Sequence, residues 1–309
     1  MPMFNNNLHS LSMLLNIEHH TRYVYSEPVN YTIQQLRLTP QSGHGQHVKR
    51  WDIKVNGELN AVEDSFGNIT HTLVVDKPHS EIVIIAAGEV ETGLTTITQQ
   101  ADASKKELLP LPIYLRVTPL TLSDEAIRNF AKAFQRPSFS QNSALEDMMH
   151  ALLARVSYIP GVTQVTTSAI EAFQLGQGVC QDHAHVFIAC CRSIGLPARY
   201  VSGYLFTEDG SLMQTHAWAD VWLQDEGWQS FDVSNGCRTY AVHVRLATGL
   251  DYRTASPVSG MRSGGGMEGM ASSVVVNQAN RPSDQQYRIN QTALIQQAEL
   301  LRQAQQAQQ

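Results

Sequence analysis

The chain has 309 residues, 42% apolar and 16% charged, a composition typical of a soluble globular protein long enough for two domains. Its formal net charge of −6 comes from 22 basic and 28 acidic residues without a polybasic face, which argues against nucleic acid as a partner. No stretch approaches the roughly 20 apolar residues of a membrane-spanning helix, so we expect no membrane partner.

The first residues do not have the features of an export signal. Residues 1–13, which begin MPMFNNNLHS, have neither a basic start nor a sustained apolar run, and no small-residue cleavage site follows. All four cysteines lie within residues 180–237, unlike the cysteines of a disulfide-rich scaffold. We therefore expect an N-terminal extension over residues 1–13, reduced thiols and a cytoplasmic protein.

Residues 14–100 alternate between polar and apolar side chains in the manner of strands. The segments LNIEHHTRYVYS and YTIQQLRLTP have a period of two, and EIVIIAAGEVET is rich in β-branched residues. In DSFGNITHTLVV, Gly67 and Asn68 favour a tight turn before a strand. The pattern predicts an all-β N-terminal domain.

Residues 101–120 interrupt this pattern and predict a linker. Proline removes a backbone donor and restricts the residue before it, and this segment holds Pro110, Pro112 and Pro119. Helical periodicity follows in LSDEAIRNFAKAF and SALEDMMHALLARV. In SAIEAFQL, Ser168 stands three residues before Glu171, the spacing of a capping box.

The segment CQDHAHVFIACCRSIGLP has the apolar stripe of a buried helix, which Gly195 and Pro197 end. ARYVSGYLF, HAWADVWLQ and GWQSFDVS then predict three consecutive strands of an antiparallel sheet. We place a core domain over residues 121–277, with a loop over residues 255–273 and SSVVVNQ as a possible returning strand. Residues 278–309 are rich in Gln and Ala and predict an amphipathic helix or a disordered tail.

Cys180 differs from the other cysteines in its position. It follows Gly176 and Gly178 and opens the predicted helix, where free backbone N–H groups and the helix dipole favour an anion. Such a position favours the thiolate, which is the nucleophilic form of cysteine. A small residue filling space in the core is the alternative, and it is the role we expect of Cys190, Cys191 and Cys237.

A thiolate nucleophile needs a base and a group that orients the base. His216 in THAWADVW begins a strand as a polar residue among apolar neighbours, and Asp232 in WQSFDVSNG closes the next strand. Two antiparallel strands joined by a turn can set these side chains side by side, so that the carboxylate holds the imidazole. On local evidence alone, each residue is equally compatible with a structural role in its strand.

Five segments together resemble the bacterial transglutaminase-like superfamily of cysteine proteases. They are GVCQDHAH, RSIGLPARYVSGYL, THAWADVW, GWQSFDVSNG and HVRLATGLDYRTASPVSGMRSGGG, in this order over about residues 120–275. RYVYSEPVNYTIQQLRLTP, with DSFGN, resembles the β-rich N-terminal region that accompanies this core in bacteria. The resemblance implies an α+β fold, in which an all-β domain precedes a papain-like transglutaminase core with a nucleophile helix packed on an antiparallel sheet.

The resemblance also implies a triad, because the family's Cys, His and Asp motifs fall on Cys180, His216 and Asp232. The sequence departs from the family at His183, where an aromatic or apolar residue is usual. It departs again after Asp232, where Val233 and Ser234 replace the usual Pro-Thr. Loss of that proline puts the turn that aims Asp232 in question.

The implied activity is cysteine-dependent acyl transfer on peptide or carboxamide bonds through a thioester intermediate. Release by water makes the enzyme a protease or amidase, and release by an amine makes it a transglutaminase. No segment indicates the dry amine pocket that transfer requires, so hydrolysis is the default. We expect a protein or peptide substrate, and oxyanion donors at the backbone N–H of Cys180 and, less directly, at Gln177. A catalytically inactive protein-binding module on the same fold is the alternative.

Zinc is a further alternative, since Cys180, His183 and His185 are donors that zinc prefers. On a helix, however, position 185 points away from the face that positions 180 and 183 share. Neither a CxxC pair nor an HExxH element supplies further ligands, and no calcium loop of the form D-x-[DN]-x-[DN]-G occurs. We therefore expect an enzyme without metal or cofactor, with His183 and His185 on the helix surface or supporting the site.

Overall fold

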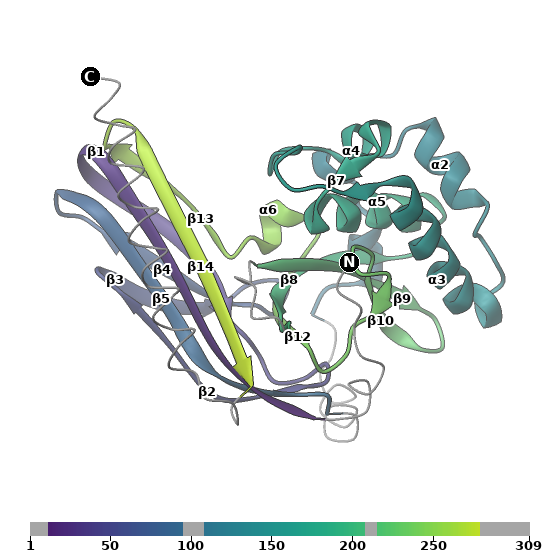
Figure 1. Ribbon diagram of the computed structural model, residues 1–309, viewed down its shortest axis with the longest axis horizontal. Helices are drawn as coiled ribbons and strands as arrows, with labels where there is room; N and C mark the ends of the chain where they lie inside the picture. The colour runs from purple at the N-terminus through teal and green to yellow at the C-terminus, as the bar shows by residue number, and fades with distance from the viewer. Residues whose placement is uncertain (1–11, 95–107, 208–214, 279–309) are drawn as a thin grey trace.

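The computed structural model describes residues 12–94, 108–207 and 215–278. These residues form a large N-terminal sheet, a smaller five-stranded sheet and a group of helices, with the smaller sheet between the other two parts (Figure 1). The arrangement confirms the predicted α+β fold, in which a β-rich region precedes a core of helices packed on an antiparallel sheet. The predicted N-terminal extension and Gln-rich tail lie almost wholly outside these ranges. Among the helices within them, none is long and apolar enough to cross a membrane.

The segment predicted to be β-rich supplies five strands: β1 (Met13–Thr39), β2 (Gln46–Val55), β3 (Glu58–Glu63), β4 (Ile69–Val75) and β5 (His79–Thr92). Buried and less buried residues alternate along β1 from Met13 to Tyr25, which confirms the period of two. The DSFGN segment forms the turn before β4, where the Asp64 carboxylate accepts hydrogen bonds from the backbone N–H groups of Phe66 and Asn68 at 2.9 and 3.0 Å.

β1 is long, and its two halves pair with different strands. Residues 13–24 pair with β5, whereas residues 32–39 pair with β4. The ladder with β5 is irregular between Val24 and Val29, a stretch that contains Pro28. Proline cannot donate a ladder hydrogen bond, so a break is expected there. One strand therefore stands at the centre of the strand order β2-β5-β1-β4-β3.

A hairpin from the far end of the described chain completes this sheet. Its strands, β13 (Val258–Gly264) and β14 (Glu268–Gln278), both pair antiparallel with β1. Figure 1 shows β14 running alongside β1 for much of its length. The loop predicted over residues 255–273 is therefore wrong, whereas the returning strand predicted at SSVVVNQ is confirmed as the end of β14. Short Gly and Ser side chains conceal the strand pattern here, and pairing with β1 overrides their low propensity.

The glycines of this hairpin lie at its turn. Gly264, Gly265 and Gly266 all have positive φ angles, of 88°, 93° and 57°. Such angles are unstrained for glycine and uncommon for other residues, so the glycine run directs the reversal of the chain. Its place at the tip of a hairpin accounts for the loop-like sequence.

The described part of the predicted linker packs against the core. It forms two short 3-10 helices, η2 (Leu111–Leu115) and η3 (Pro119–Thr121), each with a proline in its first turn. The Tyr114 ring in η2 is buried and lies edge-on against Trp228, with ring centroids 4.9 Å apart. The buried Arg192 guanidinium donates to the backbone oxygen of Tyr114 at 2.9 Å and to Thr121 Oγ1 at 2.7 Å. These contacts fix the segment in place.

Within the described residues, the core contains the α-helices α2 (Glu125–Lys132), α3 (Ser138–Arg155), α4 (Ala169–Leu175), α5 (Cys180–Ser193) and α6 (Tyr252–Ala255). Its antiparallel sheet contains β8 (Ala198–Leu205), β9 (His216–Leu223), β10 (Gly227–Asp232), β11 (Cys237–Arg238) and β12 (His243–Gly249), in the order β11-β10-β9-β8-β12. The predicted capping box begins α4: Ser168 Oγ accepts from the Glu171 N–H, and the Ser168 N–H donates to Glu171 Oε2 at 2.7 Å.

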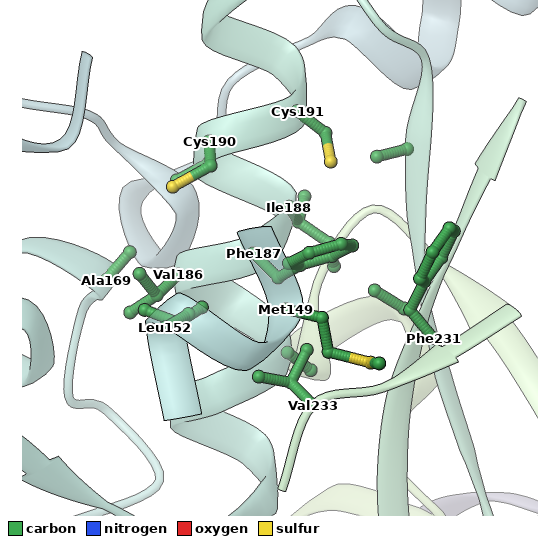
Figure 2. Close-up of a cluster of buried hydrophobic side chains, with 14 of the residues drawn as sticks. Met149, Leu152, Ala169, Val186, Phe187, Ile188, Cys190, Cys191, Phe231 and Val233 are labelled. Carbon is green, nitrogen blue, oxygen red and sulfur yellow. The ribbon is translucent and has the colours of Figure 1, made fainter. Parts of the chain in front are cut away.

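The helix α5 is buried along nearly its whole length. It packs on β8 and β9 and is covered by α2, α3 and α4. In its core, the Phe187 ring lies 5.2 Å from the Phe231 ring, with Met149 of α3 nearby (Figure 2). Cys190 and Cys191 are fully buried and their thiols point in different directions, which confirms their expected space-filling role. A helix enclosed in this way holds its first residue in a fixed position.

A buried polar cluster joins four strands of the smaller sheet. The Asp220 carboxylate on β9 accepts from Arg199 Nε on β8 at 2.9 Å and from Arg245 Nη1 on β12 at 2.7 Å. Ser230 Oγ on β10 donates to the same carboxylate at 2.7 Å. Burial alone raises the pKa of Asp220, but the two guanidinium groups outweigh it and lower that pKa below its ordinary value.

Two side-chain amides join the N-terminal sheet to the outer edge of β12. Gln46 accepts from the Arg245 N–H at 2.8 Å and donates to the Arg245 carbonyl at 2.9 Å. Asn68 makes the same two contacts with Thr248, both at 2.8 Å. Each amide therefore satisfies one donor and one acceptor of an edge strand, as a neighbouring strand does.

Candidate active site

Cys180 is the first residue of α5, and the backbone before it is held on both sides. Gly176 ends α4 with a positive φ of 70°, and β7 (Gln177–Gly178) then pairs in parallel with β6 (Ser157–Tyr158). Only glycine fits at position 178, because a Cβ there would lie 2.7 Å from the Asp182 side chain. Asp182 Oδ2 accepts from the Val179 N–H at 2.8 Å and closes the first turn. The half-buried Cys180 thiol is thus presented at a helix N-terminus.

His216 lies between Cys180 and Asp232. It is the first residue of β9, and its Nε2 donates to Asp232 Oδ2 at 2.7 Å. His216 also hydrogen-bonds Cys180, which leaves Nδ1 as the ring nitrogen for the sulfur. Burial alone lowers the pKa of His216, but Asp232 and Cys180 outweigh it and raise that pKa to about 10. The imidazole is therefore cationic at neutral pH, and the three predicted residues lie in one connected chain.

Asp232 is fully buried at the end of β10 and is held by several donors. Besides His216, Asn235 Nδ2 lies 2.7 Å from Oδ2, while Ser234 Oγ and the Asn235 N–H reach Oδ1 at 2.9 and 3.3 Å. Burial raises the pKa of Asp232, but His216 and His243 outweigh it and hold the pKa well below its ordinary value. Ser234 and Asn235 thus fix the turn that lacks the family's proline.

His243 is a member of this cluster that the sequence analysis did not identify. It is the first residue of β12, and its buried Nε2 lies 3.0 Å from Asp232 Oδ2. Its Nδ1 accepts from the Tyr240 N–H at 3.2 Å. The segment AVHVRLA around His243 has the same signal that identified His216, a polar residue at the start of an apolar strand. The contact with Asp232 depends on tertiary placement, which the sequence pattern does not supply.

Trp218 covers the two imidazoles. Its ring centroid lies 6.2 Å from that of His216 and 5.4 Å from that of His243, and the side chain is 1% exposed. Gly203 on β8 makes room for the indole, since a Cβ at that position would lie 2.5 Å from Trp218 Cη2. The ring therefore keeps water from the inner side of the cluster, which strengthens its charge interactions.

Tyr158 lies near Cys180. Its side chain in β6 is 49% exposed, and its ring stacks on the buried His183 with centroids 6.2 Å apart. Burial raises the pKa of Tyr158 to about 12, with further contributions from Cys180 and Asp232. An exposed aromatic ring this close to the thiol is positioned to contact a substrate.

The two histidines of α5, His183 and His185, lie in the interior instead of on the helix surface. His183 Nε2 and Nδ1 lie 2.7 and 3.0 Å from the backbone oxygens of Val156 and Val179. His185 Nε2 accepts from the Tyr252 N–H at 3.1 Å, and burial lowers the pKa of His185 to about 3. Of the two expected positions, the helix surface is wrong for both residues, and their hydrogen bonds to backbone groups agree with the alternative, a supporting position behind the site.

Among the described residues, one group of donors is compact enough to be compared with a metal site: His216, Asp232 and His243, whose donor atoms lie within 4.8 Å of one another. The N···O distances of 2.7 and 3.0 Å are those of hydrogen bonds. Nitrogen and oxygen ligands around tetrahedral zinc lie about 3.3 Å apart, given bonds of about 2.0 Å. The group therefore suits shared protons better than a metal ion.

The other thiols differ from Cys180 in their surroundings. Burial raises the pKa values of Cys190 and Cys191 above the ordinary range. Cys237, half-buried beside Asp232, has its pKa raised to about 12 by burial and by that carboxylate. Three of the four thiols are thus held protonated at neutral pH, whereas Cys180 hydrogen-bonds an imidazolium.

Two segments of the chain match known protein families. Residues 15–91 match the bacterial transglutaminase-like N-terminal region, and residues 128–233 match the transglutaminase-like superfamily. An uncharacterized protein of Mycobacterium leprae is 27% identical over 265 residues, which span 82% of this chain and 94% of that protein. A protein-glutamine gamma-glutamyltransferase of Pseudomonas aeruginosa is 26% identical over 176 residues, 50% of this chain and 24% of the relative.

A solved structure from Cytophaga hutchinsonii, named as a candidate cysteine protease, has the same fold with a TM-score of 0.70. It is 20% identical in sequence, and the match covers 89% of this chain and 93% of the other. The match spans the N-terminal sheet and the core together. The chain therefore belongs to the transglutaminase-like superfamily, with the bacterial transglutaminase-like N-terminal region ahead of the core.

Proposed function

We propose that this protein is a cysteine-dependent acyl-transfer enzyme that acts on peptide or carboxamide bonds of a protein or peptide substrate. Cys180 is the nucleophile, His216 the general acid and base, and Asp232 the residue that orients His216. One observation carries the proposal: His216 hydrogen-bonds Cys180 on one side and Asp232, at 2.7 Å, on the other. The carboxylate sets the tautomer of the imidazole and stabilises its cationic form.

The reaction begins with the thiolate of Cys180. Its sulfur attacks the substrate carbonyl carbon, and the carbonyl electron pair moves to oxygen, where N–H groups at the start of α5 stabilise the oxyanion. The carbon–nitrogen bond breaks as His216 donates its Nδ1 proton to the leaving amine. The products of this half are a free amine and a thioester on Cys180.

Either of two acceptors completes the turnover. Neutral His216 removes a proton from water or from an amine, the acceptor attacks the thioester carbonyl, and the thiolate leaves with His216 protonated again. Water gives a carboxylic acid, and an amine gives a new amide. Hydrolysis is the default because amine transfer needs a site that excludes water. The names of the relatives point both ways, one to a cysteine protease and one to a glutamyltransferase.

A catalytically inactive binding module on the same fold is the second candidate. An inactive scaffold has no chemical need for a thiol, an imidazole and a carboxylate in one connected chain. The intact chain therefore favours the enzyme. The cytoplasmic location expected from the sequence stays a prediction.

Incubation of the protein with casein and a labelled amine tests the proposal. Ammonia release, amine incorporation and new peptide termini distinguish amidase, transglutaminase and protease activity. We expect activity in at least one channel and none in Cys180→Ala. Labelling by iodoacetamide across pH provides a check that needs no substrate. The proposal fails if Cys180 is labelled with the pH dependence of a free cysteine and no faster than Cys237.

A further inference from the structure

Asp232 interacts with a second imidazole, that of His243, which has no assigned role in the proposed reaction. Asp232 Oδ2 receives His216 Nε2 at 2.7 Å and His243 Nε2 at 3.0 Å. The two imidazoles approach it from different strands, β9 and β12, with ring centroids 6.1 Å apart. One carboxylate oxygen thus lies between two rings, and only one of the rings reaches the sulfur.

The hydrogen bonds of His243 define its protonation. Its Nδ1 lies 3.2 Å from the Tyr240 backbone nitrogen. A backbone N–H can only donate, so Nδ1 must be the acceptor and carry no proton. The ring proton then lies on Nε2, which faces the carboxylate. His243 is therefore a neutral imidazole in the Nε2–H form that donates to Asp232.

The surroundings favour this neutral form. The titratable groups that face His243 are Asp232 on β10, His216 on β9 and Tyr240 just before β12. Arg245, on the same strand, directs its guanidinium to Asp220. Burial lowers the pKa of His243, and Asp232 and a backbone hydrogen bond at Tyr240, which both raise it, offset this only in part. A second proton here would place two cations on one carboxylate and weaken the hold of Asp232 on His216.

We propose that His243 is a positioning residue for the reaction, a proposal that rests on the function proposed above. As a neutral donor it holds the Asp232 carboxylate in the orientation in which Oδ2 meets His216, and it adds no charge to the thiolate–imidazolium pair. Cys180, His216, Asp232 and His243 then form one connected unit. Misplacement of a supporting group by about 1 Å can slow a reaction up to about 100-fold.

Two substitutions separate donation from packing. His243→Gln keeps an N–H donor and does not titrate, whereas His243→Leu keeps bulk and removes the donor. We expect kcat of His243→Leu to fall about 10-fold to 100-fold with little change in KM, and His243→Gln to recover most of the loss. The acid limb of the kcat/KM profile should also move to higher pH in His243→Leu, because Asp232 loses a donor that lowers its pKa.

His19→Leu is the matched control, since it removes another buried histidine, one whose hydrogen bonds go to hydroxyl groups instead of Asp232. It should lower Tm without moving the acid limb. Equal impairment of His243→Gln and His243→Leu, or a His243→Leu enzyme with wild-type kcat and an unmoved acid limb, overturns the proposal.

A measurement on the unmodified protein does not depend on how the variants fold. The ¹⁵N shifts of His243 should report the neutral Nε2–H form from about pH 5 to pH 8. A cationic ring or the Nδ1–H form in that range overturns the proposal. Absence of any turnover by the wild-type protein would instead count against the proposed function, and the ¹⁵N result would still stand on its own.

Discussion

His19 in the N-terminal sheet and His216 in the core are both histidines on strands with little exposure, yet their pKa values move in opposite directions. The hydrogen-bond partners of His19 are hydroxyl groups: Tyr204 Oη at 2.9 Å, and Ser272 Oγ and Thr21 Oγ1, both at 3.1 Å. Burial therefore lowers its pKa to about 4, with a small contribution from His20. His216 faces a carboxylate and a thiol, and its pKa rises to about 10. The charge of the partner, more than burial, decides the state of the ring.

The two histidines consequently stabilise the fold over different pH ranges. The folded pKa of His216 lies above its unfolded value, so its contribution is complete below about pH 6.5 and is lost as pH rises through about 10. The folded pKa of His19 lies below its unfolded value, so its contribution is complete above about pH 6.5 and is lost as pH falls through about 4. Of these two histidines, His19 in the N-terminal sheet therefore contributes to the acid limit of stability and His216 in the core to the alkaline limit.

The largest effect should follow from removal of the thiol. Cys180→Ala should lower kcat/KM by about 10³-fold or more, because no other group at the site supplies the nucleophile. The protein should remain folded, which circular dichroism checks, and ¹⁵N shifts should show a lower pKa for His216. Activity retained in the variant would mean that the nucleophile has been misassigned.

His19→Gln tests the contribution of His19 to the loss of stability at acid pH. The wild-type protein should lose about 3 kcal/mol of unfolding free energy at His19 between about pH 7 and pH 4, and the variant should not. Urea titrations at both pH values measure the difference. His185, whose pKa is lowered to about 3, still titrates in both proteins and sets the remaining acid sensitivity. An identical pH dependence of the unfolding free energy in the two proteins would show that His19 does not contribute to the loss of stability at acid pH.

The connection between the two regions is tested at Asn68. Asn68→Ala removes both partners of the Thr248 backbone, and an unsatisfied buried group costs about 1–3 kcal/mol. Thermal unfolding should therefore begin at a lower temperature, while kcat below that temperature stays at the wild-type value. A large fall in kcat in the folded variant would show that the N-terminal sheet also controls the chemistry.

The smallest effect is expected at a thiol that only fills space. Cys190→Ala leaves a small void beside α5 and should destabilise the protein by about 1 kcal/mol, in the range usual for single substitutions. Its kcat/KM should equal that of the wild type. The variant therefore serves as the cysteine control for Cys180→Ala, and a comparable loss of activity in both would undermine the distinction between the thiols.

Local sequence signals predicted much of this arrangement. Two glycines before Cys180, a polar His216 at the start of an apolar strand and an aspartate at the end of the next strand each carry their own pattern. The antiparallel turn between β9 and β10 then brings His216 and Asp232 together. Strand alternation and the capping box at Ser168 are local in the same sense.

The features that were missed depend on contacts between distant segments. His243 reaches Asp232 because the start of β12 lies at the same end of the sheet as the start of β9 and the end of β10, a placement that only the pairing of distant strands sets. Apart from SSVVVNQ, which the sequence indicated as a strand, the β13–β14 hairpin becomes a sheet element only through β1, since its Gly and Ser residues favour no strand by themselves. The buried positions of His183 and His185 follow from the helices that cover α5.

The pairing of β1 with β14 also bears on how the protein is made. Leu15 lies opposite Gln278 and Tyr25 opposite Glu268, so the earliest strand to be synthesised acquires this neighbour from the last described strand (Figure 1). Until that segment leaves the ribosome, one edge of β1 has backbone groups open to other chains. A message cut short before residue 268 should therefore yield an aggregation-prone product, because β1 then lacks β14 as a neighbour.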